Sequence, residues 1–160
     1  MFTFAPTAGQ PKAELHADLV ESARALIDGE PDSIANMANV AALIWQFLPD
    51  LNWAGFYRMV DDELVLGPFI GKPACIRIAL GKGVCGTAAA CGQTQLVPDV
   101  HAFPGHIACD AASRSELVVP VIRDGAVIAV IDLDSPSPAR FDAEDAQGIE
   151  ALARAVAYRI

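Results

Sequence analysis

The chain has 160 residues, of which 53% are hydrophobic and 19% charged, and its formal net charge is −9 at pH 7. This length suits one domain with a single core, and the hydrophobic fraction is too high for a disordered chain. The acidic excess argues against nucleic acid and anionic membranes as partners. No apolar run nears the ~20 residues that span a bilayer, and the N-terminus does not resemble a secretory signal. We therefore expect a cytoplasmic protein whose thiols stay reduced.

The spacing of apolar residues and the positions of Gly, Pro and Asp predict the elements along the chain. In chain order we expect a tail at 1–11, helices at 12–29 and 31–48, a hairpin of strands at 53–59 and 63–69, a short strand at 74–78, a helix at 84–91, a short strand at 94–97, a long loop at 98–114, strands at 116–122 and 126–134, and a final helix from Asp142. Because hairpins join the longest strands, residues 12–160 should form one α+β domain with a mainly antiparallel sheet and packed helices. The loop at 98–114 is longer than structural loops usually are, which indicates a functional role.

The last hairpin is predicted to gather three carboxylates. Asp132 and Asp134 are two residues apart, so both leave their strand on one face. A three-residue loop at 123–125 would put Glu116 opposite Asp132, whereas a two-residue loop would turn Glu116 to the other face. We favour the three-residue loop, because it leaves the other face entirely apolar. Carboxylates this close raise one another's pKa, so one could stay protonated and donate a proton; a solvated strand end beside a cation is the alternative.

The four cysteines form no CxxC pair. Cys75 begins a strand beside a Gly/Pro loop, and Cys109 lies in the long loop. Cys85 opens a helix, where the helix dipole and Lys82 should lower the pKa of its thiol. We expect a small, buried apolar role for Cys91. Burial as a structural residue is the commoner fate of free cysteine, but three thiols that border loops favour chemistry.

Other interpretations of these residues are weaker. A zinc site of His101, His106, Cys109 and a further thiol does not fit the usual ligand spacing, so we expect the histidines to order the loop or to face solvent. A Cys–His nucleophile lacks an orienting residue, and the Gly-rich segment 81–86 lacks the full phosphate-loop pattern. Trp53 and Tyr57 share one face of their strand. They are mostly core, but an aromatic wall beside carboxylates would suit a small ligand with a cationic end.

Five segments together resemble the free methionine-(R)-sulfoxide reductases, a family built on the GAF fold. They are NWAGFYRM (52–59), GPFIGKPACIRI (67–78), GKGVCGTAAA (81–90), VPDVHAFPGHIACDAASRSE (97–116) and VIDLDSP (130–136). The resemblance runs from the first helix to the last. The loop that ends in HIACDAASRSE is specific to this family, because generic GAF sensor domains do not carry it.

The resemblance implies a role for most of the thiols and acids. Cys109 matches the nucleophile that attacks the sulfoxide sulfur, Cys75 the resolving cysteine and Cys85 an auxiliary thiol, while Cys91 matches no motif. The matching pocket residues are an acidic cluster that holds the substrate ammonium and protonates or orients the sulfoxide oxygen, and two aromatics near the substrate methyl group: Glu116, Asp132, Asp134, Trp53 and Tyr57.

The resemblance also implies the reaction and its partners. Free L-methionine-(R)-S-oxide would be reduced to L-methionine through a cysteine sulfenic acid and an intramolecular disulfide, which thioredoxin recycles. The reaction would need no metal or other cofactor. The resemblance also implies a role in repair under oxidative stress. A homodimer is expected from fold analogy alone. The alternative is a GAF module that binds a small ligand or senses redox state without turnover, although such a module needs neither the acidic cluster nor a second thiol.

Overall fold

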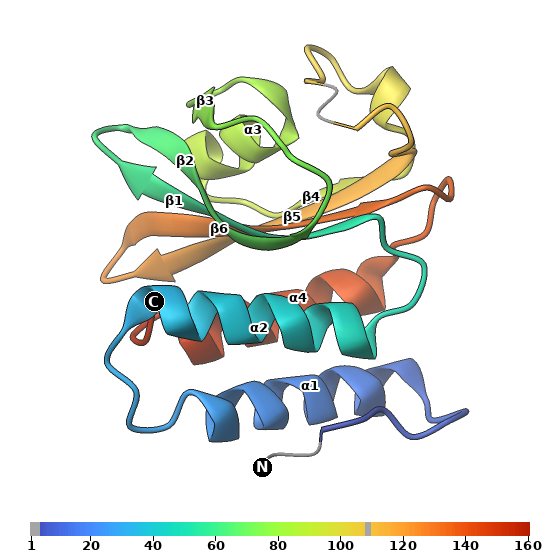
Figure 1. Cartoon of the computed structure of the whole chain (residues 1–160). Helices are drawn as coiled ribbons and strands as arrows, with labels where there is room; N and C mark the ends of the chain where they lie inside the picture. The colour runs from blue at the N-terminus through green and yellow to red at the C-terminus, as the bar shows by residue number, and fades with distance from the viewer. Residues whose placement is uncertain (1–3, 108–109) are drawn as a thin grey trace.

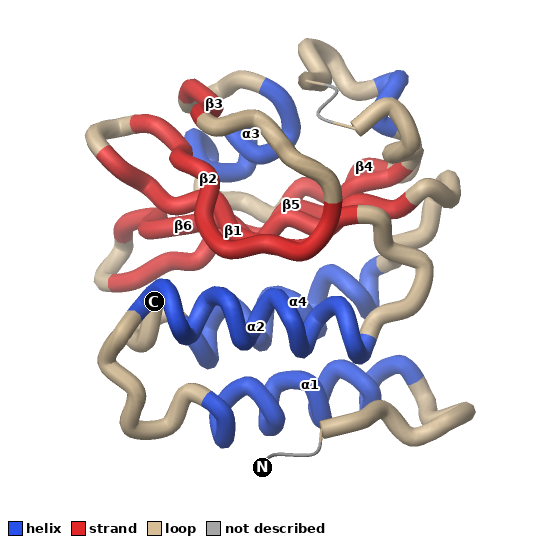
Figure 2. The backbone as a smooth tube through the Cα atoms, viewed as in Figure 1, coloured by secondary structure: helices blue, strands red, loops and turns tan. Residues whose placement is uncertain are grey.

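The structure is a computed structural model that describes residues 4–107 and 110–160. A central sheet separates two layers of different character (Figure 1). Helices α2 (Ser33–Phe47) and α4 (Ala143–Val156) pack on one face of the sheet, and α1 (Lys12–Leu26) packs on these two helices. The other face carries the short helix α3 (Gly83–Cys91) and the long loop before β5, which includes a short helical turn, η1 (Val100–Ala102) (Figure 2).

The described residues form one sheet of six strands, in which every pair of neighbours is antiparallel. Its spatial order is β3-β2-β1-β6-β5-β4. The strands are β1 (Trp53–Val60), β2 (Glu63–Gly71), β3 (Arg77–Ala79), β4 (Gln95–Val97), β5 (Ser115–Arg123) and β6 (Ala126–Ser135). This arrangement confirms the predicted α+β class with a mainly antiparallel sheet.

The period of two along the strands divides the buried side chains into two cores. The helices α2 and α4 pack against Phe56 of β1 and against the odd-numbered apolar residues of β5 and β6, such as Leu117 and Ile131. Trp53 and Tyr57 face the other way and pack with α3. The strand periodicity therefore predicted the two faces of β1 correctly, and it places both aromatics beside the long loop.

The register of the last hairpin differs from the prediction. Asp124 and Gly125 have φ values of 52° and 81°, which is the left-handed pair of a two-residue hairpin turn. A bulge between Val121 and Ile122 then shifts the pairing, and Glu116 lies opposite Asp134 rather than opposite Asp132. Because the bulge adds one residue to β6, it restores the shared face of the carboxylates that a two-residue turn alone would have lost.

Several predicted ends also moved. The strand expected at 74–78 is shorter and lies further along the chain, as β3 (Arg77–Ala79), and residues 74–76 belong to a loop. Helix α2 begins after Asp32, whose side chain accepts a hydrogen bond from the Ala35 N–H at 2.8 Å, so the cap and not Pro31 sets its start. At α4 the predicted Asp142 cap is confirmed, with a complete capping box.

Candidate active site

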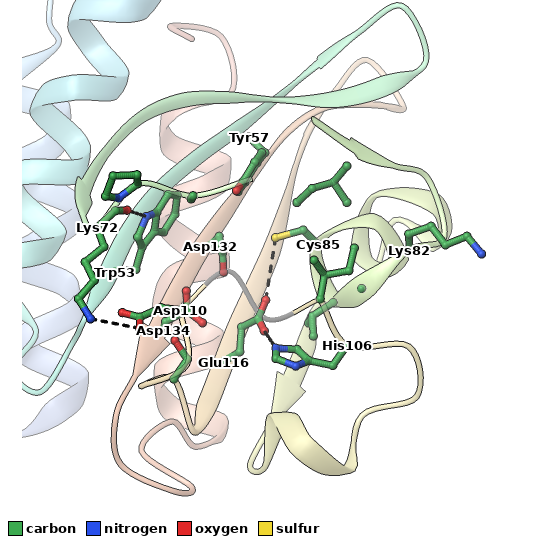
Figure 3. A pocket seen from close by; sticks show the side chains of 17 residues that line it. Trp53, Tyr57, Lys72, Lys82, Cys85, His106, Asp110, Glu116, Asp132 and Asp134 are labelled. Carbon is green, nitrogen blue, oxygen red and sulfur yellow. Dashed lines mark hydrogen bonds and ion pairs between the residues drawn. The ribbon is translucent and has the colours of Figure 1, made fainter. Parts of the chain in front are cut away.

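A pocket opens on the α3 side of the sheet, between β1, β5, β6, the start of α3, the loop after β2 and the long loop (Figure 3). The space free of protein atoms within its walls is about 530 Å³, part of it open to solvent. Of the residues predicted from the sequence, the pocket brings together Trp53, Tyr57, Cys85 and the three carboxylates. Cys109 lies outside the described residues.

Glu116, Asp132 and Asp134 converge on one wall of this pocket (Figure 3). Glu116 comes from β5 and the two aspartates from β6, and Glu116 and Asp132 are each only 6% exposed. One oxygen of Asp132, Oδ1, is buried without a hydrogen-bond partner among the described residues. Buried carboxylates of this kind are costly unless something pairs with them, so the wall is suited to a positively charged group.

Burial raises the pKa values of all three carboxyls, and repulsion from neighbouring carboxylates raises those of Glu116 and Asp134 further. Burial raises the pKa of Asp132 to about 7. Burial, and then the charges of the two aspartates, raise the pKa of Glu116 well above its ordinary value. Burial and the charge of Asp132 do the same for Asp134, against a hydrogen bond from Ser113. At neutral pH the cluster therefore holds at least one proton, and it can act as an acid as well as an anion.

Cys85 lines the pocket, with its Sγ 4.0 Å from Glu116 Oε1 (Figure 3). Burial, followed by the charges of Asp132 and Glu116, raises the pKa of this thiol well above its ordinary value. The predicted lowering by the helix dipole and Lys82 is therefore wrong. Lys82 is exposed and its side chain points away from the pocket, so its charge lowers the thiol pKa less than burial and the nearby carboxylates raise it.

The aromatic wall also holds the loop that carries Cys75. Trp53 stacks on Tyr57 with ring centroids 5.8 Å apart. Trp53 Nε1 donates a hydrogen bond to the Lys72 carbonyl at 3.2 Å, and the Tyr57 hydroxyl donates one to the Cys75 carbonyl at 3.0 Å. Cys75 is half-buried and packs against the core beside α3, next to the pocket rather than in its lining.

The described cysteines, Cys75, Cys85 and Cys91, are all free thiols. Cys91 is the last residue of α3 and is exposed, so the expected buried role is wrong. The helix ends there because Gly92 adopts the left-handed conformation that caps it. Cys91 therefore lies outside the pocket.

His106 lines the pocket, so the solvent-facing alternative expected from the sequence is wrong for this residue, while its edge contact with the His101 ring agrees with the loop-ordering alternative. Its Nε2 lies 3.9 Å from Glu116 Oε2, and its side chain is 13% exposed. Burial, and then the neighbouring His101, lower the pKa of His106, so it is neutral near pH 7. The only signal for this in the sequence was its position three residues before Cys109.

A network that the sequence did not reveal fixes the end of the long loop. Lys72 Nζ lies 3.3 Å from Asp110 Oδ1, and Asn52 Nδ2 donates to Asp110 Oδ2 at 3.2 Å and to Ser113 Oγ at 3.0 Å. The Ala112 N–H also donates to Asp110, and these bonds hold the pKa of that carboxyl below its ordinary value. Asp110 directly follows Cys109 in the chain, so the network fixes the residue next to the predicted nucleophile.

This architecture is that of a GAF domain with an acidic pocket that contains a thiol, and the sequence profile of the GAF domain matches residues 18–160. A curated relative from Escherichia coli (strain K12), named free methionine-R-sulfoxide reductase, is 53% identical over 141 residues, which are 88% of this chain and 86% of that protein. A Saccharomyces cerevisiae protein of the same name is 45% identical, over 91% of this chain and 85% of its own length.

A solved structure agrees with these relatives. The free methionine-R-sulfoxide reductase of Neisseria meningitidis, in complex with its substrate, superposes with a TM-score of 0.94 at 43% identity, over 99% of this chain and 95% of that one. The chain belongs to the free methionine-R-sulfoxide reductase family, as the motifs in the sequence indicated. In the described part of the chain, no helix combines the length and the apolar character needed to cross a bilayer.

Proposed function

We propose that this chain reduces free L-methionine-(R)-S-oxide to L-methionine. The observation that carries the proposal is the convergence of three carboxylates, of which Glu116 and Asp132 are buried, opposite an aromatic wall in one pocket. The relatives named free methionine-R-sulfoxide reductase support the same activity. Cys109 is the proposed nucleophile, Cys75 the resolving thiol and Cys85 an auxiliary thiol.

The carboxylates give a physical reason for a free amino acid as substrate. The ammonium of a free amino acid can pair with Glu116, Asp132 and Asp134, which otherwise lack a lysine or arginine partner among the described ion pairs. Methionine sulfoxide within a peptide has a neutral amide at that position and leaves the buried charge unpaired, which costs several kcal/mol. Trp53 and Tyr57 then contact the methyl end of the substrate.

The chemistry needs only thiols and one acid. The Cys109 thiolate attacks the sulfoxide sulfur, and a carboxyl of the cluster protonates the oxygen as the S–O bond breaks. The hydroxyl moves to the Cys109 sulfur as the bond between the two sulfurs breaks, so methionine leaves and Cys109, oxidised by two electrons, becomes a sulfenic acid. The proton that the thiol released restores the carboxyl. The Cys75 thiol next attacks the Cys109 sulfur, so that a disulfide forms and water departs.

A dithiol reductant must then open the disulfide, and we propose thioredoxin for this step. The cycle therefore needs a compartment that keeps thiols reduced, which is why a cytoplasmic location forms part of the proposal. A homodimer stays a prediction from fold analogy.

The test is methionine formation driven by dithiothreitol from each sulfoxide epimer. We expect turnover of the R epimer only, and none in Cys109→Ser. The matched control Cys91→Ser replaces an exposed thiol outside the pocket and should keep full activity. N-acetylmethionine-(R)-sulfoxide, which lacks the ammonium, should be a poor substrate. Full activity in Cys109→Ser would refute this mechanism, and substrate binding without any turnover in the unaltered protein would favour the sensor module.

A further inference from the structure

We propose that this pocket is also a binding site for a thiophilic divalent cation of the Zn²⁺ or Cd²⁺ type, held by Cys85, Glu116 and Asp132. The cation is a competing ligand and not a cofactor of the proposed reaction. Its binding depends only on the described side chains. Its competition with substrate rests on the proposed function.

The geometry of the three groups is close to a coordination shell. Within the described residues, one ligand atom from each of Cys85, Glu116 and Asp132 lies within 4.8 Å of the other two. A tetrahedral zinc ion with bonds of about 2.0–2.3 Å brings its ligand atoms to within about 3.3–3.8 Å of one another. Shifts of about 1 Å or less in the side chains would therefore close the shell.

A second observation is independent of the cluster itself. Asp132 is 6% exposed, lines the pocket, and has a buried oxygen, Oδ1, without a hydrogen-bond partner in the described part of the chain. Native proteins leave few buried polar atoms unpaired, and each one calls for an explanation. A cation between Asp132 and Cys85 would supply the missing partner and offset the repulsion between the carboxylates.

The donor set selects the class of cation. Mg²⁺ and Ca²⁺ prefer shells of six or more oxygens, whereas a thiolate favours Zn²⁺ and softer ions. His106 offers an imidazole nitrogen 3.9 Å from the second oxygen of Glu116 and is therefore placed to supply a fourth ligand. Because the thiol must lose its proton to bind, affinity should rise with pH.

The test is a Cd²⁺ titration of the reduced protein, kept reduced with a phosphine because dithiothreitol chelates metals. Calorimetry gives the affinity, and the ultraviolet sulfur-to-cadmium charge-transfer band reports the thiolate bond. We expect one ion per chain, a charge-transfer band, and no detectable binding of Mg²⁺. Cys85→Ser should lose the band and weaken binding by about tenfold or more. The matched control Cys91→Ser, which alters an exposed thiol, should bind as the unaltered protein does.

Asp132→Asn keeps the side-chain shape and should also weaken binding, which protects the test if Cys85→Ser fails to fold. Unchanged affinity in both variants would overturn the site, as would a band that survives in Cys85→Ser but disappears in Cys109→Ser. Methionine-(R)-sulfoxide should raise the apparent Kd for Cd²⁺. Binding that requires Cys85 but ignores the sulfoxide would keep the metal site and refute the competition, so failure of the proposed function can be told apart from failure of the site.

Discussion

Cys85 Sγ lies 4.0 Å from Glu116 Oε1, and both side chains are buried on the wall of the same pocket. The thiol is therefore surrounded by groups that become anionic as the pH rises. Its pKa is raised by burial and by these charges, in contrast to the low thiol pKa values usual at helix N-termini.

Glu116→Gln should make Cys85 more reactive, because it removes one of the charges that oppose the thiolate. Iodoacetamide labelling of Cys85, followed by mass spectrometry from pH 7 to pH 10, should show a lower apparent pKa in the variant. Cys91 on the same chain is exposed and serves as the internal control, with the same labelling rate in both proteins. Slower labelling of Cys85 in Glu116→Gln would contradict this account of its environment.

KM for methionine-(R)-sulfoxide should rise as the pH falls from about 8 to about 6. Burial raises the pKa of Asp132 to about 7, so its carboxylate loses its charge over this interval, and the substrate ammonium then loses a partner. The rise in KM should approach tenfold per pH unit below the apparent pKa, which belongs to the coupled cluster.

Asp132→Asn should have a high KM that changes little with pH. Asp61→Asn, in the β1–β2 turn, should follow the unaltered protein. A KM that stays level in the unaltered protein would argue against the ammonium site.

Glu116→Gln should also stabilise the fold, and more so at pH 8 than at pH 4. The folded pKa of Glu116 lies above its unfolded value because of burial and its acidic neighbours. The folded state thus binds this proton more tightly, and the free energy of unfolding falls as the pH rises between the two pKa values. Replacing the acid removes that loss, so thermal melts should show Tm higher by several degrees at pH 8 and a smaller change at pH 4. Equal changes at both pH values would contradict a cost of ionisation.

The sequence was informative where one local rule decides the structure. The period of two in β1 and β6 put Trp53 with Tyr57 and Asp132 with Asp134, and the structure keeps both pairs. The sequence did not predict the register of the hairpin of β5 and β6, because the bulge in β6 depends on how two strands pack over their whole length and leaves no local signal. The prediction that the acids share one face was correct, although it assumed a three-residue loop where the structure has a two-residue turn and a bulge.

Electrostatics and loops were harder for a different reason. The helix start and Lys82 are local features of Cys85. The pKa of its thiol is raised by burial and then by carboxylates of β5 and β6, which lie far along the chain. His106 and Lys72 lie in segments without periodicity, so nothing near them in the sequence says which way they point. Only the folded loops bring them to the pocket.

Gly148→Ala should destabilise the protein although alanine is the better helix former. A Cβ at this position in α4 would lie 2.2 Å from His16 Cγ and 2.6 Å from His16 Cβ, so α1 would have to move. That movement breaks the buried contact of 3.0 Å between His16 Nε2 and Asp145 Oδ1, which joins the two helices. Breaking such a pair costs about 3 kcal/mol or more, or roughly 6–12 °C in Tm for a chain of this size.

The matched control for Gly148→Ala is Gln147→Ala, an exposed neighbour on the same helix, which should melt within about 2 °C of the unaltered protein. Because α1 and α4 lie on the opposite side of the sheet from the pocket, KM measured well below the lowered Tm should be unchanged in Gly148→Ala.

The side chain of Asp145 also contacts Lys12 and Arg140, and these partners with His16 hold its pKa well below the ordinary value. Its contribution to stability is therefore present above the unfolded pKa and is lost as the pH falls through the folded one. Accordingly the Tm difference between Gly148→Ala and the unaltered protein should shrink in strong acid, and a difference that grew there would show that the His16–Asp145 contact is not what the new methyl group breaks.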